Sequence, residues 1–416
     1  MIITEHAKRN LLILSWALYD LANQFFALNV VSLYFPRWLT IENNTPEIFY
    51  GLSFGISMLL VAVCAPFLGT MADIKGRHKP FLIFFTLIAV IFTVALGLTK
   101  SISLALIFFA IANFGCQEAI IFYNALMIKV APGKRIGLVS GLGRMFGYSG
   151  AILALLFTKP IIMKVGYQMT FIVTGVLFFL FALPCMLFVR DSSCSKKSWR
   201  EDLFDKSVIT ETISRLKESV FKRRMFEGLI DFLKVVFFLL CVVNTVILFM
   251  SIYASRVFGL TTSQVIDLIA FSTVFAMVSS VVSGYISDLV GYRKALMGVF
   301  VLWILCILGG GLLNVPFHWL LGAIAGTSLG ATWVILRAMI IKLIPEENLG
   351  EAFGIFNLIG YLSAVIGPVL WGLTLLYFTR MGEAGYRIAF LSMILFLIVG
   401  MLLLVRKGKD ILKGGK

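Results

Sequence analysis

Four charged residues lie well inside long apolar stretches of the sequence: Asp20, Glu118, Arg144 and Arg337. A charge at the middle of a bilayer costs at least about 2.5–3.5 kcal/mol on insertion scales, so each side chain must face the protein interior and find a partner. An acid in such a place can bind and release a proton as its surroundings change, and an arginine can bind an anionic group or neutralise the acid. The alternative is a permanent ion pair between one acid and Arg144 that only ties two helices together.

Polar side chains accompany these charges at helical spacing. Asn23 and Gln24 follow Asp20 at i+3 and i+4, so the three share one face of a helix. Gln117 and Asn124, seven residues apart, likewise share a face of the stretch that carries the second acid. Of the two acids, Asp20 is the one that we expect to carry a proton, with the other as the alternative. The predicted cavity-lining residues are Tyr19, Asn23, Gln24, Gln117, Tyr123, Asn124, Asn244, Trp333, Asn357 and Tyr361.

The composition shows which elements must position these side chains. The chain has 416 residues, of which 60% are apolar and 14% are charged, and its mean hydropathy is +0.98. Soluble globular chains are about 45–50% apolar and about 25% charged, so most soluble enzymes and nucleic-acid modules are excluded. Because a spanning helix needs roughly 20 residues, we predict twelve of them. Their approximate ranges are 11–35, 50–71, 81–99, 102–128, 137–158, 168–189, 234–258, 265–287, 295–313, 318–343, 351–378 and 386–405.

The distribution of positive charge predicts the orientation. With both ends of the chain in the cytoplasm, most of the 36 Lys and Arg residues fall in cytoplasmic segments, as the positive-inside rule requires. The net charge of +15 then reflects membrane orientation and not binding to nucleic acid. We predict a multi-pass protein of the cell (inner or plasma) membrane with cytoplasmic N- and C-termini. The basic residues placed outside are Arg37, Lys100, Lys159, Lys164, Arg256, Arg380 and Arg387.

One long hydrophilic segment divides the chain. We predict an N-terminal six-helix bundle at 1–190, a cytoplasmic linker at 191–233 and a C-terminal six-helix bundle at 234–416. The predicted fold class is an all-α membrane protein. Apolar residues between 209 and 220 recur at helical spacing beside basic residues, which favours a helix lying on the membrane surface. A solvated charged linker is the alternative.

An internal repeat supports two related halves. The segments 69–79 and 284–294 carry Gly, Asp and Gly at the same spacing, 215 residues apart, and each follows an apolar stretch. The acids can pair with nearby basic residues and brace one face of the protein reversibly, because a rim ion pair is worth only about 1 kcal/mol. The alternative is a loop that only fixes topology. The residues of this predicted gating motif are Gly69, Asp73, Gly76, Arg77, Gly284, Asp288, Gly291 and Arg293.

A second correspondence runs at an offset of 213 residues and involves close helix packing. Gly137 and Gly141 form a G-x-x-x-G, and Gly350 and Gly354 repeat it. Such glycines let two helices approach closely in a membrane. The predicted packing residues are Gly137, Gly141, Gly350, Gly354, Gly367 and Pro368.

The loop motif at 69–79, with its weaker copy at 284–294, resembles the signature of the major facilitator superfamily. That resemblance covers essentially the whole chain. It implies twelve helices, a central cavity between two bundles, and alternating access by rocking of the halves.

Within the helices, the chain is similar to the vacuole-effluxer-like branch of that superfamily at 16–23, 123–126, 137–143 and 147–148. Fungal members of this branch are linked to release of amino acids from the vacuole. The C-terminal half departs from the pattern: Val242-Val243 replace an Asp-Gly, Trp333 replaces a Gln and Tyr361 replaces a Lys. These changes make the C-terminal wall more apolar, which shifts the expectation toward an amphipathic substrate.

Cofactor and metal chemistry have no support in the sequence. The six Cys show no C-x-x-C pair and the three His are scattered, so we expect free thiols, no metal site and no cofactor. Nucleotide-binding and serine-nucleophile motifs occur in no usable context, so we expect no enzyme activity and no nucleic-acid partner.

These patterns together predict a secondary active transporter of a small organic solute. We expect an amino acid or related metabolite, outward movement, coupling to protons and function as a monomer in the lipid bilayer. One alternative is a transporter or flippase of a lipid or drug. The other is a sensor or assembly protein that keeps the scaffold without transport.

Overall fold

The computed structural model describes residues 5–75, 77–130, 136–189, 227–313, 316–343 and 349–413, without the side chains at 5–9, 73–75, 127–129, 136–145, 227, 288, 341, 349–353 and 408–413. The regular elements in these ranges are helical, which confirms the all-α fold class. They are α1 (Glu5–Phe26), η1 (Ala27–Leu33), α2 (Tyr34–Arg37), η2 (Trp38–Glu42), α3 (Glu47–Lys75), α4 (Lys79–Leu98), α5 (Ile102–Val130), α6 (Ile136–Lys164), α7 (Tyr167–Phe188), α10 (Glu227–Phe258), α11 (Thr262–Val290), α12 (Tyr292–Leu312), α13 (His318–Leu343), α14 (Leu349–Tyr377), η5 (Thr379–Met381), α15 (Glu383–Ser392) and α16 (Ile394–Lys413).

Twelve helical segments in the described ranges are long and apolar enough to cross a membrane, which confirms the predicted number. Each overlaps one of the predicted stretches. The first is longer than predicted, from Asn10 to Glu42, because α1, η1, α2 and η2 follow one another without a break. The predicted membrane-surface helix and Cys194 fall in residues 190–226, outside the described part of the chain.

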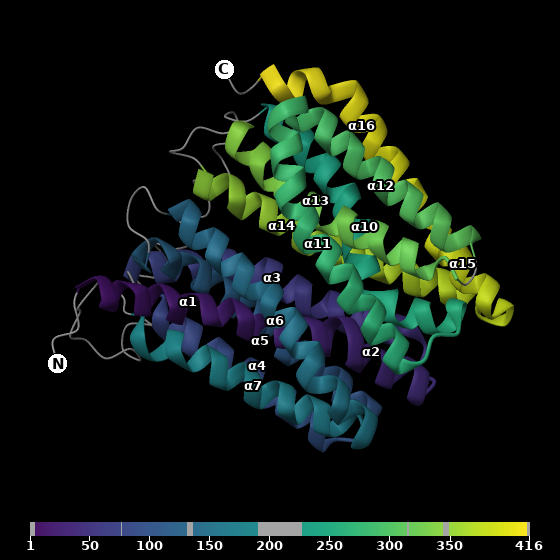
Figure 1. Ribbon diagram of the computed structural model, residues 1–416, viewed down its shortest axis with the longest axis horizontal. Helices are drawn as coiled ribbons and strands as arrows, with labels where there is room; N and C mark the ends of the chain where they lie inside the picture. Colours follow the sequence, from purple (N-terminus) through teal and green to yellow (C-terminus); the bar gives the residue numbers. More distant parts are fainter. Residues whose placement is uncertain are drawn as a thin grey trace. The chain divides into compact units, whose positions relative to one another are not determined.

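The chain divides into two compact units, each described here by itself. Unit 1 comprises Met1–Val31 and Ser57–Arg223, and unit 2 comprises Ser32–Ile56 and Arg224–Lys416. In unit 1, α4 packs against α5 and α7, while α1 packs against α5, α6 and α7 (Figure 1). In unit 2, α11 packs against α13, and α10 packs against α14 and α16. Grouping of residues 32–56 with the C-terminal half is a feature that the sequence did not predict.

The first span changes helix type near the boundary between the units. The segment Ala27–Leu33 is a π-helix, and a second π-helical segment follows at Trp38–Glu42. Asn29 lies in the first segment and ties it to two other helices of unit 1: its Nδ2 donates to Thr174 Oγ1 at 3.1 Å, and Thr158 Oγ1 donates to its Oδ1 at 3.3 Å. π-Helical turns are rare and occur often at functional sites. This part of the first span is therefore a candidate functional segment.

The polar side chains that interrupt the apolar helices have local partners. Thr86, Thr158 and Thr245 each donate a hydroxyl hydrogen bond to the backbone carbonyl four residues earlier. This pattern satisfies a hydroxyl without leaving the helix. It explains how hydroxyl residues are accommodated in segments that must lie in an apolar environment.

Candidate functional site

An aromatic stack joins α1 to α5 in unit 1. The Trp16 and Tyr123 rings lie 4.6 Å apart at 10°, and the Tyr19 ring stacks on the other side of Tyr123 at 4.8 Å. The Trp16 indole donates to the Tyr123 carbonyl at 3.1 Å, and the Tyr19 hydroxyl hydrogen-bonds Thr86 Oγ1 at 2.6 Å. All three rings are buried. Two predicted cavity residues, Tyr19 and Tyr123, are therefore parts of a packed wall.

Buried amides continue this wall along α1 and α5. Asn23 is buried, and its Oδ1 accepts a long contact from the Cys116 thiol at 3.9 Å. Asn113 is fully buried, and its Nδ2 donates to Ser57 Oγ of α3 at 2.7 Å. The Asn113 Oδ1 has no hydrogen-bond partner among the described residues. The interior of unit 1 thus offers more acceptors than donors along α5.

Glu118 lies on the same helix. Its exposed fraction is 0%, and neither carboxyl oxygen has a hydrogen-bond partner within the described part of the chain. The Cys64 thiol of α3 lies close enough to interact with it electrostatically. An ion pair would normally accompany a carboxylate buried this deeply, because burying a lone charge costs several kcal/mol. Within the described residues, this carboxyl lies in an environment poorly suited to a permanent charge.

Asp20 occupies a different environment. It is only partly buried and faces α6 at Gly147, where an added Cβ would lie 3.3 Å from Asp20 Oδ2 and 3.7 Å from Gln24 Nε2. Asp20 and Gln24 therefore share a face, as their spacing predicts, and a glycine makes room for them. The Arg144 side chain lies outside the description.

The remaining cavity candidates of unit 1 are less covered than the aromatic stack. Gln117 is partly buried and Asn124 is exposed. Exposure of the Asn124 side chain leaves it available to solvent or solute in this conformation.

The predicted polar residues of unit 2 are more dispersed. Asn244 donates to Ser363 Oγ at 3.0 Å and so joins α10 to α14. Trp333, Arg337 and Tyr361 are partly buried, and Asn357 is exposed. The helix that carries Asn244 is otherwise strongly apolar, and Val242 and Val243 are both fully buried.

The gating motif is described in part. Gly291 lies between α11 and α12 with a φ of 87°, a backbone conformation that glycine adopts without strain. Arg293 donates to the Val405 carbonyl of α16 at 2.9 Å. The proposed ion pairs involve the carboxylates of Asp73 and Asp288. Both side chains, and Gly76, lie outside the description. Arg77 and Gly284 are partly buried, and so is Gly69, where an added Cβ would meet nothing within 4 Å.

Close helix packing involves glycines that the sequence analysis did not single out. Gly322, Gly326 and Gly330 recur every four residues on α13 and face α11; an added Cβ at Gly326 would lie 2.0 Å from the Ser272 carbonyl oxygen. Their i, i+4, i+8 spacing in the sequence is typical of a face where two membrane helices approach closely.

Among the predicted packing residues, Gly367 lies very close to α10: an added Cβ would lie 2.3 Å from the Cys241 carbonyl oxygen. Its neighbour Pro368 is buried inside α14. At Gly354 an added Cβ would meet nothing within 4 Å. The side chains at 137, 141 and 350 lie outside the description.

A second polar cluster, which the sequence analysis missed, lies in unit 2. Arg37 is only 2% exposed, and its guanidinium donates to the Ser251 carbonyl at 2.9 Å, to Ser255 Oγ and to Thr262 Oγ1 at 3.0 Å. Ser251 Oγ returns a hydrogen bond to the Ser32 carbonyl at 2.8 Å. The end of the first span is thereby fastened to α10 and α11.

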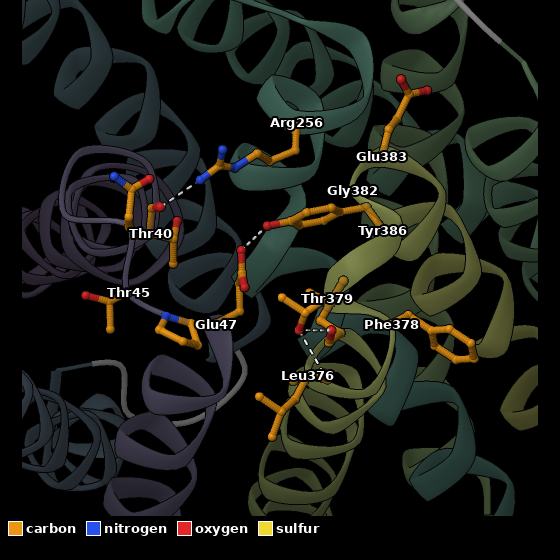
Figure 2. A pocket seen from close by; sticks show the side chains of 14 residues that line it. Thr40, Thr45, Glu47, Arg256, Leu376, Phe378, Thr379, Gly382, Glu383 and Tyr386 are labelled. Atoms are coloured by element: carbon orange, nitrogen blue, oxygen red, sulfur yellow. Dashed lines mark hydrogen bonds between the residues drawn. The ribbon is translucent and has the colours of Figure 1, made fainter.

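Beside this cluster lies a cavity of about 470 Å³, shown in Figure 2. The Arg256 guanidinium donates to the Thr40 carbonyl at 2.8 Å and also hydrogen-bonds Tyr386. The Tyr386 hydroxyl donates to Glu47 Oε1. The lining comprises Thr40, Asn44, Thr45, Pro46, Glu47, Arg256, Gly372, Leu375, Leu376, Phe378, Thr379, Gly382, Glu383 and Tyr386.

Twelve helices long and apolar enough to cross a membrane, with ionisable groups buried among them in the described part of the chain, define a multi-pass membrane protein. The sequence model of the Major Facilitator Superfamily matches residues 21–286 and again residues 233–414, and the chain belongs to this superfamily. Two overlapping matches along one chain are in keeping with two related halves.

Relatives of similar length support this assignment. The chain is 26% identical over 411 residues to the "Uncharacterized MFS-type transporter YxiO" of Bacillus subtilis (strain 168), covering 94% of this chain and 93% of the relative. It is 25% identical over 386 residues to the "Multidrug resistance protein MdtG" of Enterobacter lignolyticus, covering 87% and 85%.

Solved structures share the fold at low sequence identity. A bacterial homolog of the human lysosomal transporter Spinster, inward-facing and unoccupied, superimposes with a TM-score of 0.77 at 16% identity and covers 98% of each chain. The nucleoside transporter NupG gives a TM-score of 0.72 at 14% identity and covers 97% of this chain and 99% of its own. These likenesses define the fold.

Proposed function

We propose that this transporter moves a small organic solute by alternating access and that protons binding at Glu118 drive the movement. The finding that carries the proposal is the burial of Glu118, whose two carboxyl oxygens have no hydrogen-bond partner among the described residues. A lone buried carboxylate is costly and a neutral carboxyl is much less so. Proton binding is therefore favoured while the site is dry, and release is favoured when water reaches it.

This assignment differs from the expectation drawn from sequence, which preferred Asp20. Asp20 is partly buried, shares its face with Gln24, and takes part in interactions of its own in the structure. A carboxylate that keeps partners and partial exposure has less reason to change its protonation as a cavity opens and closes. Asp20 is then better suited to contact the solute or to position α6.

The solute class rests on chemistry and on relatives. Amide and aromatic side chains dominate the predicted cavity residues of unit 1, which suits a compound with both polar and apolar parts. We propose an amino acid or related metabolite moved outward, as the resemblance to the vacuole-effluxer-like branch implies. The second candidate is an amphipathic drug or lipid, favoured by the apolar helix around Val242 and Val243 and by the name of the MdtG relative.

The sequence predictions on placement belong to the same proposal. We propose that both termini lie in the cytoplasm, that the protein resides in the inner or plasma membrane, and that it functions as a monomer. Bundles at 1–190 and 234–416, joined by the linker at 191–233, would supply the two halves that move. Gating at Asp73 and Asp288 would close the cytoplasmic face.

A first experiment needs no knowledge of the solute. Infrared difference spectra of the purified protein, recorded between low and high pH, report the C=O band of protonated carboxylic acids. We expect a band at neutral pH that Glu118→Gln removes and that Asp20→Asn leaves in place. Loss of the band in Asp20→Asn alone would transfer the proton site to Asp20.

A second experiment measures coupling. A solute that stabilises the protein against heat is first found by screening metabolites and drugs in detergent. In liposomes with an imposed pH gradient, Glu118→Gln should reduce accumulation of that solute at least tenfold while exchange at equal pH continues. The matched control, Asp20→Asn, should retain gradient-driven accumulation if it binds solute. Full accumulation by Glu118→Gln would overturn the assignment.

A further inference from the structure

The cavity in unit 2 has the size and lining of a binding site that is separate from Glu118. Its volume of about 470 Å³ falls within the roughly 300–1,000 Å³ range of small-molecule sites. Leu375, Leu376 and Phe378 supply apolar parts of the lining, and Glu47 and Arg256 supply charge. Figure 2 shows the Tyr386 hydroxyl pointing to Glu47 and the Arg256 side chain pointing to Thr40.

The hydrogen bonds in this cavity leave acceptor positions open on Glu47. Glu47 accepts from the Tyr386 hydroxyl through Oε1, and a carboxylate has about four acceptor positions in all. Arg256 donates to the Thr40 carbonyl and keeps donor positions of its own. Glu47 can therefore accept further donors from a molecule in the cavity.

The charges that face the cavity are one carboxylate and one guanidinium. Glu383 also lines the cavity but is engaged by Arg387 at 2.9 Å, which leaves Glu47 and Arg256 as the charges that face the space. An ammonium group placed at Glu47 would be attracted by this carboxylate and repelled by Arg256, and its apolar part could rest on Leu375.

We propose that this cavity binds a small organic cation, with its ammonium group on Glu47 and its apolar part against Leu375, Leu376 and Phe378. The ammonium group would share the Glu47 carboxylate with the hydrogen bond from the Tyr386 hydroxyl. Because this hydrogen bond joins α15 to the start of α3, an occupied cavity also alters how α3 is held within unit 2. The site is thus placed to sense a cation at the loop that ends the first span.

The probe is n-butylammonium chloride, and sodium butyrate is the control of the same length and opposite charge. Thermal unfolding of the full-length protein in detergent is followed by tryptophan fluorescence at constant ionic strength. A ligand that binds only the folded state raises the unfolding temperature in a saturable manner. We expect saturable stabilisation with n-butylammonium and none with butyrate. Equal stabilisation by both, or by neither, would overturn the proposal.

Two charge variants should shift the half-saturating concentration of n-butylammonium in opposite directions and so locate the site. Glu47→Gln should raise the half-saturating concentration of n-butylammonium at least tenfold, whereas Arg256→Gln should lower it several-fold because a like charge is removed. Leu376→Trp, which fills the cavity, should abolish the response even if Glu47→Gln proves unstable. Weaker binding in both charge variants would overturn the placement of the ammonium group on Glu47.

Two further variants separate this site from others. Asp267→Asn removes a carboxylate of unit 2 that does not line the cavity, and Glu118→Gln removes the proposed proton site of unit 1. Both should respond to n-butylammonium as the wild type does. A changed half-saturating concentration in either would contradict binding at the cavity. These experiments measure ligand binding and not transport. A negative result would therefore overturn the proposed cation site without bearing on proton binding at Glu118.

Discussion

The two units differ in the partners of their buried polar groups. In unit 1 the buried polar groups Asn23, Asn113 and Glu118 lie within the spans, and Glu118 has no described hydrogen-bond partner. In unit 2 the strongest described polar network gathers around Arg37, near the end of the first span, and Asn244 of α10 donates to Ser363 of α14.

This difference shows which contacts hold and which are free to respond. Arg37 has three described acceptors, so its network resembles a fastening. Glu118 has no described hydrogen-bond partner, so its environment favours the protonated, neutral carboxyl over the carboxylate. Because Arg37 is held by several acceptors, we expect it to contribute to stability, whereas a buried carboxyl with no described hydrogen-bond partner is a candidate for function.

The largest expected effect concerns the apolar packing of unit 2. Gly326→Ala places a Cβ 2.0 Å from the backbone oxygen of Ser272, so α13 and α11 must separate. We expect a loss of about 3 kcal/mol or more in stability, at the upper end for overpacking, and little folded protein after mild heating. The matched control, Gly298→Ala, meets no atom within 4 Å and should be at least as stable as the wild type.

The next effect tests the fastening role of Arg37. Arg37→Met keeps an unbranched apolar stem but removes the guanidinium and its donors to α10 and α11. Each of these three hydrogen bonds is worth about 1.5–3 kcal/mol, and removal of the buried charge relieves a desolvation penalty of several kcal/mol. We therefore expect a net loss of about 2 kcal/mol, measured as a lower unfolding temperature in detergent. Arg380→Met, on the exposed η5, should change stability by less than about 0.5 kcal/mol. Similar shifts for both would remove the distinction.

A smaller effect should have opposite signs in the two units. Glu118→Leu removes a buried polar group without a partner and should stabilise the protein by about 1 kcal/mol, while proton coupling is lost. Glu47→Leu removes the acceptor of the Tyr386 hydroxyl and should destabilise it by about 1 kcal/mol. Thermal unfolding of the two variants side by side is the measurement. Destabilisation by Glu118→Leu would mean that the carboxyl has a structural partner.

An effect of similar size concerns two buried tyrosine hydroxyls. Tyr19→Phe removes the hydrogen bond to Thr86 in unit 1, and Tyr253→Phe removes the 2.6 Å bond to the Gly310 carbonyl in unit 2. Each should cost about 1 kcal/mol, since both are single neutral hydrogen bonds. Denaturation in detergent measures both. A much larger loss in Tyr19→Phe would show that the aromatic stack depends on this hydroxyl.

Sequence reasoning reached the spans and one buried charge, Glu118, because both leave a local mark. A run of about 20 apolar residues has few alternatives to a membrane helix, and the acid at 118 stands out against such a run. The same reasoning preferred Asp20 to Glu118, since spacing along a helix shows which residues share a face but not which face finds partners. It also passed over Gly322, Gly326 and Gly330, although their spacing was visible.

The sequence by itself determined the helical class, the twelve spans and the identity of the residues able to carry charge, because these depend on hydropathy and composition. Only the tertiary structure decided that Arg37, expected among outward-facing charges, is buried against residues more than 200 positions later. It alone decided that Glu118 lacks a described partner and that Glu47 meets Tyr386 beside a cavity. Partners so distant along the chain are chosen by how the helices pack, and no local pattern of residues records that choice.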